Sequence, residues 1–334
     1  ALLSPMRASF IRYVTSSANG FTIDSSSFPL TVEKAHKLAA KWLEQQDVPE
    51  ASESSRHLIM HAAELGTRYS DFQKNIHKVL NSTQKSCFEH LVQQRAQRVP
   101  VQYLVGNWDF FGLQITCQQP ILIPRPETEE LVERCLQELK RSPKTLLDVL
   151  DVGAGTGAIG IAICAQMLEK THVTAIDINP QAVKLAQQNA QSNLKDPERY
   201  LVIESDFLSF AKKTVHGNRK LFDMIVSNPP YIPSSQLSGL QTEVGYYEDQ
   251  LALDGGVEGL DIIVQLIEWG GKLLSPEGSR VMWLEVDTSH PALITRLFFD
   301  DKQKRDVCGI DSVDCFSDLS GNPRFVRVRF VKYV

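Results

Sequence analysis

The feature that most limits how this chain can fold is an alternation of short apolar runs with amphipathic segments, between Thr145 and Val286. Short apolar runs are typical of buried strands, and the segments between them carry apolar residues at helical spacing. Strands and helices in this order form a mostly parallel sheet with helices on both faces, so we predict a doubly wound α/β fold. The expected elements are Thr145–Val152, Ala158–Glu169, His172–Ile178, Pro180–Ser192, Tyr200–Glu204, Leu221–Ser227, Leu260–Leu274 and Arg280–Val286.

A different pattern precedes this alternation. Between Thr31 and Arg98 the apolar residues recur at helical spacing, which predicts a small N-terminal helical bundle. Pro49 separates the first two helices, because proline cannot continue a helix and disfavours a helical residue before it. Two further helices are expected near Asp71–Leu80 and Thr83–Arg98.

The stretch between the two parts is rich in aromatic and β-branched residues. Val101–Phe111 and Gln114–Ile123 flank Gly112, which predicts a linking β-hairpin. Pro126 then stands where a new helix can begin. The expected domains are a helical substrate-recognition domain at 30–98, a hairpin linker at 99–125 and a catalytic domain at 126–334.

The overall composition argues against several classes of protein. The 35 Lys and Arg residues against 40 Asp and Glu residues give a net charge of −5, so no global positive field attracts nucleic acid. No apolar run approaches the roughly 18 residues that span a bilayer. The six cysteines form no C-x-x-C pair, which favours a reducing compartment over a zinc or disulfide site. His57 and His61 lack the glutamate of H-E-x-x-H, so we expect no metal site.

The first residues have a composition of their own. Residues 1–23 contain Arg7, Arg12 and several Ser and Thr residues, with no acidic residue before Asp24. This is the composition of a mitochondrial transit segment, and a disordered tail is the alternative. We therefore expect residues 1–29 to be a leader outside the folded domains.

A glycine-rich turn follows the first strand of the α/β part. Asp151–Gly157, with the sequence D-V-G-A-G-T-G, stands where a buried strand passes into a helix. Glycines there let the backbone approach a ligand closely, and the helix start presents unpaired N–H groups, so an adenosine-containing cofactor is indicated. A phosphate-binding P-loop is excluded because no lysine follows the glycines.

Two kinds of cofactor remain for this turn. Gly155–Gly160 satisfies the dinucleotide fingerprint G-x-G-x-x-G, and Asp177 at the end of the next strand fits ribose binding in either case. The longer pattern D-x-G-x-G-x-G resembles the first motif of S-adenosylmethionine-dependent methyltransferases. A glycine turn at a helix start also accommodates the ammonium and carboxylate of a methionine group.

A second motif, Asn228–Tyr231 (N-P-P-Y), follows the strand Leu221–Ser227. Ligands of open parallel sheets bind beyond the carboxyl ends of strands, so the motif should face the same crevice as the glycine turn. Its prolines leave carbonyl groups free to accept hydrogen bonds, Asn228 offers another acceptor and Tyr231 a flat wall. A planar –NH2 group would thus be held with its nitrogen towards an electrophile. The motif resembles that of amino-group methyltransferases, whose targets include adenine, guanine and glutamine amides.

Further stretches narrow the resemblance to one family. Over roughly residues 30–334 the chain resembles the HemK/PrmC family of protein-(glutamine-N5) methyltransferases, which modify the Gly-Gly-Gln loop of peptide-chain release factors. The resemblance implies a class I methyltransferase fold with a seven-stranded sheet and an N-terminal helical domain. The stretches that carry it, besides the glycine turn and N-P-P-Y, are Val99–Gly106, Trp108–Leu113, Ile123–Glu129 and Ala252–Leu260.

The same resemblance assigns roles to residues. S-adenosylmethionine is the implied cofactor, a class I release factor the implied partner, and the mitochondrial matrix the implied location. Arg125 and Glu127 are expected at the mouth of the site, unless they only form an ion pair at a helix start. The implied cofactor-binding residues are Asp151, Gly153, Ala154, Gly155, Thr156, Gly157, Asp177, Phe207 and Asn228. The implied substrate-binding residues are Asn228, Pro229, Pro230 and Tyr231, of which Asn228, Pro229 and Tyr231 are the expected catalytic residues.

Two other functions remain open from the sequence. One is an amino-methyltransferase acting on adenine or guanine in nucleic acid, against which the acidic charge balance argues. The other is a non-catalytic binding module with a methyltransferase fold, against which the intact motifs argue. We expect no direct contact with nucleic acid and no association with a membrane.

Overall fold

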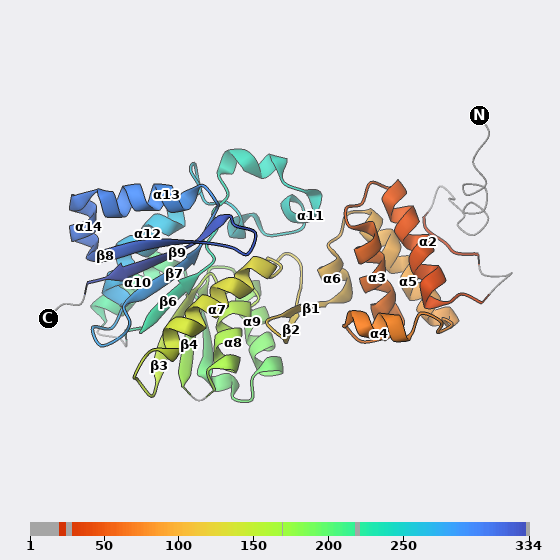
Figure 1. The fold of residues 1–334 in the computed structure, drawn as a ribbon, viewed down its shortest axis with the longest axis horizontal. Helices are drawn as coiled ribbons and strands as arrows, with labels where there is room; N and C mark the ends of the chain where they lie inside the picture. The colour runs from red at the N-terminus through yellow and green to blue at the C-terminus, as the bar shows by residue number, and fades with distance from the viewer. Residues whose placement is uncertain (1–19, 25–28, 169, 218–220, 332–334) are drawn as a thin grey trace. The chain divides into compact units, whose positions relative to one another are not determined.

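The computed structural model describes residues 20–24, 29–168, 170–217 and 221–331. Residues 1–19 and 25–28 of the expected leader lie outside the described residues. Phe21 and Ile23 are fully buried in the core of the first unit, so the fold begins before the boundary expected at residue 29. The chain divides into two compact units, Ala1–Gly106 and Asn107–Val334, each with its own hydrophobic core (Figure 1). In the part of the chain that the structure describes, no helix is both long and apolar enough to cross a bilayer.

The first unit is a bundle of helices. Leu43, Leu58 and Phe88 are among the fully buried residues of its core. Thr31 and Asn81 cap its two longest helices, because their side chains accept hydrogen bonds from backbone N–H groups three residues later. The helices are α2 (Val32–Gln45), α3 (Ala51–Ala62), α4 (Tyr69–Lys74), α5 (Ser82–Ala96) and α6 (Val101–Val105).

The expected helix at Asp71–Leu80 is wrong in its second half. Helix α4 ends at Lys74, and Val79 forms an isolated antiparallel bridge with Thr31. The backbone N–H of Leu80 donates to the carbonyl of Leu30 at 2.9 Å. This segment therefore satisfies its backbone groups against the chain entering α2, and local periodicity could not reveal that partner.

The expected strand at Val101–Phe111 is wrong in its first half. Val101–Val105 is the short helix α6, which follows Pro100 and ends at Gly106 in the left-handed region, with φ 78°. Proline before a helix and glycine after it are signals for a helix rather than a strand. Packing against the core of the first unit outweighs the β-propensity of the valines and the tyrosine.

A shorter hairpin than predicted follows α6. Strand β1 (Asn107–Phe110) pairs antiparallel with β2 (Leu113–Thr116). The two turn residues, Phe111 and Gly112, both have positive φ, 54° and 77°. This is the geometry of a type I′ turn, which matches the twist of a hairpin and favours glycine at its second position.

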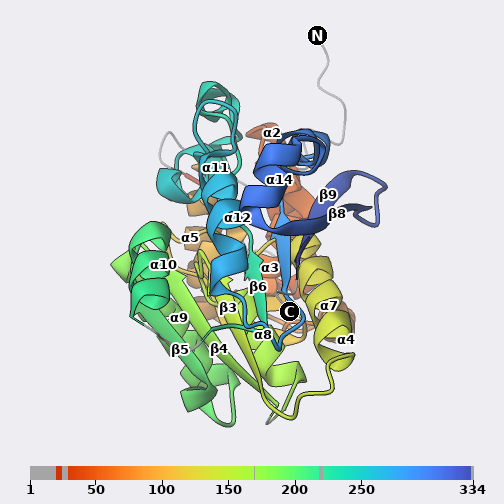
Figure 2. The ribbon, with the colours of Figure 1, turned by 90° about the vertical axis from the view of Figure 1, so that its left-hand side faces the viewer.

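The second unit contains a seven-stranded sheet, in the order β5-β4-β3-β6-β7-β9-β8. Strands β5, β4, β3, β6 and β7 are parallel to one another, and β9 is antiparallel to both of its neighbours, β7 and β8. Figure 2 shows β5, β4, β3 and β6 side by side. The predicted mostly parallel, doubly wound sheet is confirmed. The strands are β3 (Leu147–Val152), β4 (Thr171–Asp177), β5 (Tyr200–Glu204), β6 (Met224–Ser227), β7 (Val281–Glu285), β8 (Ile310–Ser317) and β9 (Pro323–Phe330).

Helices cover both faces of this sheet and form two separate cores. One core contains residues of α7 (Pro126–Lys140), α8 (Ala158–Gln166) and α9 (Pro180–Asn193). The other contains residues of α10 (Phe207–His216) and α12 (Asp261–Leu273). The remaining described helical segments are Pro197–Arg199, Ser234–Gly239, α11 (Thr242–Gly245), Gln250–Ala252, α13 (His290–Ile294), a π-helix at Thr295–Asp300 and α14 (Lys302–Cys308).

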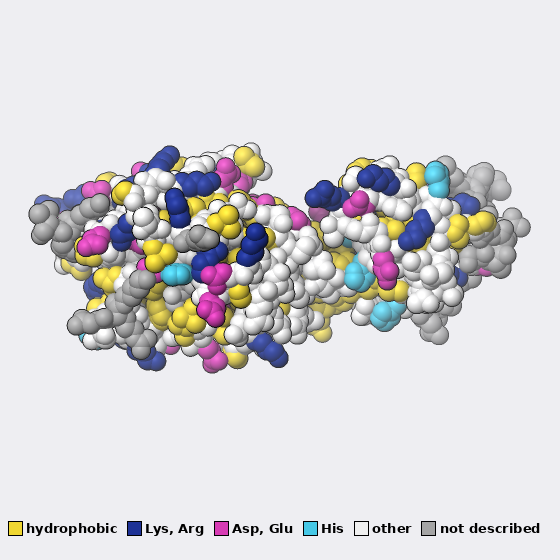
Figure 3. Space-filling model, turned by 90° about the horizontal axis from the view of Figure 1, so that it is seen from below, with side chains coloured by type: hydrophobic (Ala, Val, Ile, Leu, Met, Phe, Trp, Pro, Cys, Tyr) yellow, Lys and Arg dark blue, Asp and Glu magenta, His cyan; other side chains and the backbone are white. Residues whose placement is uncertain are grey.

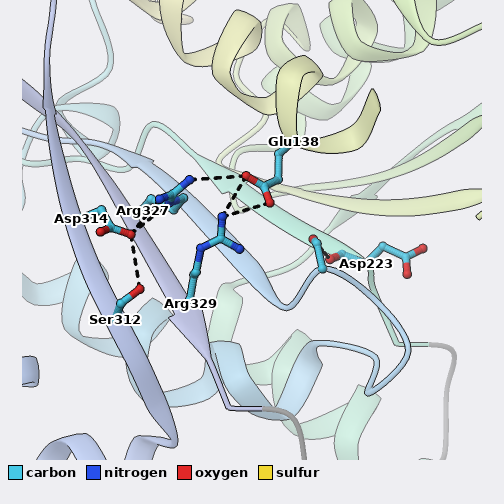
Figure 4. Close-up of polar contacts among 7 residues, drawn as sticks. Glu138, Asp223, Ser312, Asp314, Arg327 and Arg329 are labelled. Atoms are coloured by element: carbon cyan, nitrogen blue, oxygen red, sulfur yellow. Dashed lines mark hydrogen bonds and ion pairs between the residues drawn. The ribbon is translucent and has the colours of Figure 1, made fainter. Parts of the chain in front are cut away.

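The last two strands are joined to α7 by a network of charged side chains. Arg327 and Arg329 of β9 both form ion pairs with Glu138 of α7 (Figure 4). Arg327 also binds Asp314 of β8 at 3.0 Å, and Ser312 donates to the same carboxylate. The basic side chains of β9 therefore stabilise the edge of the sheet, because they bind acidic groups of the same unit.

Candidate active site

A cavity of about 280 Å³ lies where the carboxyl ends of β3, β4 and β6 meet. Gly153 and Gly155 line it after β3, Asp177 at the end of β4, and Asn228 after β6. Residues that are far apart in the chain thus converge because these strands are parallel neighbours. The structure brings together the main residues of both sequence motifs.

The first two glycines of the turn expose their backbone to this cavity. Both have positive φ, 77° at Gly153 and 54° at Gly155. A Cβ atom at Gly155 would meet no protein atom within 4 Å, and one at Gly153 would meet only the carbonyl oxygen of Asn228, at 3.9 Å. A side chain at either position would be strained and would enter space next to the cavity.

The third glycine has a different role. Gly157 precedes α8 in the left-handed region, and a Cβ there would lie 2.8 Å from Ile161 and 3.0 Å from the hydroxyl of Tyr200. It permits close packing of α8 and does not line the cavity. Ala154 and Thr156, also expected at the cofactor, do not line it either.

Asp151 lies beneath the turn and outside the cavity lining. Its buried carboxylate accepts a hydrogen bond from the backbone N–H of Gly160, at 3.0 Å, in the first turn of α8. Burial raises the pKa of Asp151 to about 7. The structure gives this residue the role of fixing the helix start, which in turn fixes the glycine backbone.

Asp177 lines the cavity and also shapes the turn. One carboxylate oxygen accepts from the N–H of Gly155 and the other from that of Asn179, both at 2.8 Å. Each oxygen retains a lone pair for a further donor, such as a ribose hydroxyl. Burial raises the pKa of Asp177, and the two backbone N–H groups act in the opposite direction.

Apolar side chains form the walls of the cavity. Phe207, the first residue of α10, lines it and at the same time belongs to the core beneath that helix. Ile178 and Leu251 line the cavity on more exposed positions, at 57% and 66% exposure. Phe207, for which the resemblance implies stacking on adenine, is therefore part of the wall of this cavity.

A segment near residues 248–254 borders the same cavity, although no sequence motif predicted this. The side chain of Asn179 donates to Asp249 at 2.6 Å, and the backbone N–H of Asp249 donates to the carbonyl of Pro120 at 2.7 Å. Asp249, Leu251, Ala252 and Asp254 line the cavity. Only the resemblance of Ala252–Leu260 to the family could have indicated this segment.

A second cavity, of about 190 Å³, adjoins the first at Asn228. Pro229, Tyr231 and Arg125 line it, while Pro230 lines the first cavity. The N-P-P-Y residues therefore lie along both cavities. A group in the second cavity would be presented to one in the first at the position of Asn228.

Arg125 is held at the second cavity by Glu248. The Arg125 guanidinium forms an ion pair with this carboxylate, whose other oxygen accepts from the N–H of Ile123 at 3.2 Å. Burial raises the pKa of Glu248, and Arg125 lowers it. Arg125 lies at the expected mouth of the site, whereas Glu127 does not line either cavity.

The carboxamide of Asn228 is oriented by a neighbour from another element. Its Nδ2 atom donates to the hydroxyl of Thr128 in α7, at 3.2 Å. This leaves Oδ1 as the group that can accept a hydrogen bond from a ligand. Thr128 lies within the Ile123–Glu129 stretch, but the sequence interpretation gave it no role, because its partner Asn228 is 100 residues away in the chain.

The backbone of Tyr231 packs closely against Gly259. A Cβ at Gly259, which has φ 74°, would lie 2.2 Å from the carbonyl oxygen of Tyr231. The chain after Tyr231 continues this packing, since the N–H of Ile232 donates to the carbonyl of Leu253 at 2.9 Å. Burial raises the pKa of Tyr231 to about 12, so its hydroxyl remains protonated.

Comparison with known families gives two matches. The family model "Methyltransferase small domain" matches residues 131–243, and "PrmC N-terminal domain" matches residues 34–106. The two matches fall in the second and the first compact unit respectively. They cover the Asp151–Gly157 turn, the Asn228–Tyr231 motif and most of the helical bundle.

Individual relatives are similar over most of the chain. "MTRF1L release factor glutamine methyltransferase" from Homo sapiens is 37% identical over 307 residues, which are 89% of this chain and 88% of that protein. "Release factor glutamine methyltransferase" from Geobacter sulfurreducens is 35% identical over 257 residues, 77% of this chain and 84% of that protein.

One solved structure illustrates how widely the fold is shared. The hMettl16 catalytic domain in complex with MAT2A 3′UTR hairpin 6 has a TM-score of 0.50, over 73% of this chain and 83% of that chain. Its sequence identity is 15%. At that identity the likeness shows the fold alone.

Proposed function

This chain belongs to the family of release factor glutamine methyltransferases, and we propose that its target is the side-chain amide nitrogen of the glutamine in the Gly-Gly-Gln loop of a release factor. It is an S-adenosylmethionine-dependent protein-(glutamine-N5) methyltransferase. The single observation that carries the choice of site is that Asn228 lines both cavities at the end of β6. A donor group in one cavity and an acceptor group in the other would meet there.

The first cavity fits S-adenosylmethionine. Gly153 and Gly155 leave room beside the backbone, which a Cβ would fill. Asp177 offers carboxylate oxygens to ribose hydroxyls, and Phe207 and Ile178 offer apolar surface to an adenine ring. When bound, the cofactor supplies an electrophilic methyl group on a sulfonium. We assign cofactor binding to these residues.

The second cavity suits a carboxamide. An amide nitrogen is a weak nucleophile because its lone pair is delocalised, so orientation must supply much of the catalysis. Asn228 Oδ1 and the carbonyl oxygen of Pro229 can accept the two N–H groups and aim the nitrogen towards the first cavity. Accepting these bonds also stabilises the positive charge that develops on the nitrogen. Tyr231 supplies a flat wall for the planar group.

A protein substrate agrees better with the charge of the second unit than a nucleic acid does. On the face seen in Figure 3, its Lys and Arg side chains are scattered among acidic ones and form no continuous patch. A nucleic-acid enzyme needs such a patch to bind phosphates. From this face together with the net charge of −5, we propose that nucleic acid is not a direct partner.

We also propose a mitochondrial, matrix location. The proposal rests on the basic, acid-poor composition of residues 1–23, of which residues 1–19 lie outside the described residues. Import and removal of a leader can be tested by expressing the chain with a C-terminal tag and by sequencing the N-terminus of the mitochondrial form. A full-length, cytosolic product would contradict this part of the proposal.

The function can be tested by methyl transfer to purified substrates. The protein is incubated with S-adenosylmethionine labelled in the methyl group, and either with an intact release factor or with bulk RNA or DNA. We expect label in the release factor, on the glutamine of Gly-Gly-Gln, as located by mass spectrometry. Label in nucleic acid and none in the release factor would contradict the proposal and favour methylation of adenine or guanine instead.

A further inference from the structure

We propose that Thr128 and Glu285 are positioning residues that fix which end of the Asn228 carboxamide faces the acceptor, and so make the site select a carboxamide over a carboxylate. This inference rests on the proposed function of Asn228. Neither Thr128 nor Glu285 lines either cavity. Both would act through Asn228.

The three side chains come from three elements and lie close together at the ends of β6 and β7. Thr128 lies in the first turn of α7, Glu285 is the last residue of β7, and Asn228 follows β6. The Thr128 hydroxyl accepts a hydrogen bond from Nδ2 of Asn228 at 3.2 Å. Ser227 pairs with Leu284, so Glu285 lies next to Asn228 at the ends of the two strands, and its carboxylate interacts with the Thr128 hydroxyl. Thr128 is 4% exposed and Glu285 1% exposed, so water cannot readily replace either partner.

Which of these groups donates and which accepts follows from the hydrogen atoms that each one carries. An ionised carboxylate only accepts hydrogen bonds, so the single hydroxyl proton of Thr128 must go to Glu285. The Thr128 oxygen then has only lone pairs left to offer to Asn228. Nδ2, the donor end of the Asn228 amide, therefore donates to the Thr128 oxygen, and Oδ1 faces the ligand. Glu285 thereby determines the orientation of Asn228 from two bonds away.

This orientation has a consequence for substrate choice. Oδ1 attracts the N–H groups of a glutamine carboxamide and repels the oxygens of a glutamate carboxylate. A reversed amide would present Nδ2, which attracts the carboxylate and repels the –NH2 group. A buried polar group aimed at its partner discriminates strongly against an analogue that cannot pair with it.

The surroundings of Glu285 make the orientation sensitive to pH. Burial raises the pKa of Glu285 to about 7, while Thr128 and the positive charges of Arg324 and Arg125 lower it and Glu127 raises it. The nearby Tyr231 hydroxyl stays neutral, because its pKa is about 12. A protonated Glu285 could donate to Thr128, whose own proton would then be free for Oδ1 of Asn228. Turnover should therefore fall as the pH drops through about 7.

The first test compares two variants at position 128. Thr128→Val keeps the shape and removes the hydroxyl, whereas Thr128→Ser keeps the hydroxyl. We expect kcat for release-factor methylation to fall about 10- to 100-fold in Thr128→Val, somewhat less than for loss of a direct transition-state hydrogen bond. Thr128→Ser should restore kcat to within about threefold of wild type, and S-adenosylmethionine affinity by calorimetry should change little in either variant.

A matched control separates positioning from loss of a buried hydroxyl. Thr171, at the start of β4, is 0% exposed and its hydroxyl has no hydrogen-bond partner. Thr171→Val should leave kcat unchanged. Equal kcat in wild type and Thr128→Val, or equal losses in the Val and Ser variants, would overturn the inference.

A second variant decides the matter if Thr128→Val does not fold. Glu285→Gln removes the titrating group but leaves an oxygen that can accept from Thr128. We expect the acid-side fall in kcat of the wild type, between about pH 6 and 8, to be absent in this variant. The same fall in both proteins would refute the role of Glu285. If the wild type itself methylates no release factor, the proposed function has failed, and that result is distinguishable from either outcome above.

Discussion

The glycine turn and the N-P-P-Y turn occupy neighbouring strand ends but are built in different ways. In the glycine turn, Asp151 binds the N–H of Gly160, and Gly155 binds Asp177 on the adjacent strand. All of these residues lie within one strand–helix–strand unit. The N-P-P-Y turn instead depends on Thr128, 100 residues before Asn228, and on Glu285, well after it. The glycine turn is thus held by residues that are close in sequence, although Phe207 and Asp249 also line its cavity, whereas the N-P-P-Y turn is held by distant elements.

The two turns also share one feature, a buried carboxyl group behind the loop. Asp151 lies behind the glycines and Glu285 behind Asn228, and burial raises the pKa of each to about 7. Each carboxyl group fixes the geometry of a loop that touches the ligand. Substitutions in the two turns should therefore separate cofactor binding from methyl transfer.

The largest separation is expected at Asn228. Asn228→Ala removes the acceptor Oδ1 and should lower kcat about 10²- to 10³-fold, as for loss of one oriented hydrogen bond in the transition state. Because Gly153, Gly155 and Asp177 remain, S-adenosylmethionine affinity should stay within a few-fold of wild type. Single-turnover methylation of a release factor and calorimetry measure the two quantities. Near-normal turnover would show that Asn228 is not a catalytic residue.

On the other side of the comparison, Asp177→Ala should weaken the cofactor. The ribose hydroxyls lose a charged acceptor, and the N–H groups of Gly155 and Asn179 lose theirs, so we expect a cost of about 1.5–3 kcal/mol in binding. Titration calorimetry on the folded variant gives the value. Unchanged affinity would mean that the carboxylate does not contact the cofactor.

These contrasts explain what the sequence could and could not predict. The five parallel strands, the glycine turn and Asn228 were predictable, because periodicity and local motifs specify them. Helix α6 was mistaken for a strand because its packing partners, not its residue types, decide its conformation. Thr128 and Glu248 could not be found from spacing, since each acts on a residue about 100 or more positions away.

A smaller effect is expected from Gly155→Ala. The backbone there has φ 54°, and the new Cβ would enter the space beside the cavity, so cofactor affinity should fall by about 1–2 kcal/mol. Gly112→Ala is the matched control, because Gly112 has φ 77°, open space around a Cβ and no place in either cavity. It should lower stability by a similar amount and leave cofactor affinity unchanged. Equal losses of affinity in both variants would show a general effect of strain.

The smallest expected effect concerns the pH dependence of stability. The folded-state pKa of Asp151, about 7, lies above its ordinary value of 3.8, so between these values the folded protein binds the proton and the unfolded chain does not. The contribution of Asp151 to the free energy of unfolding therefore decreases as pH rises from 3.8 to about 7. Over this pH range, the free energy of unfolding, measured with denaturant, should decrease less in Asp151→Asn than in the wild type. The same pH dependence of the free energy of unfolding in both proteins would contradict the raised pKa of Asp151.

The most direct test of the whole account is to identify the methylated atom. The protein is incubated with S-adenosylmethionine and an intact release factor, or with the same factor in which the glutamine of Gly-Gly-Gln is replaced by glutamate. We expect a single methyl group on the side-chain nitrogen of that glutamine, as fragmentation mass spectrometry can show. No methylation is expected in the glutamate form, which lacks the nucleophilic nitrogen. A methyl group on another residue, or incorporation that persists in the glutamate form, would contradict the assignment of the acceptor site at Asn228.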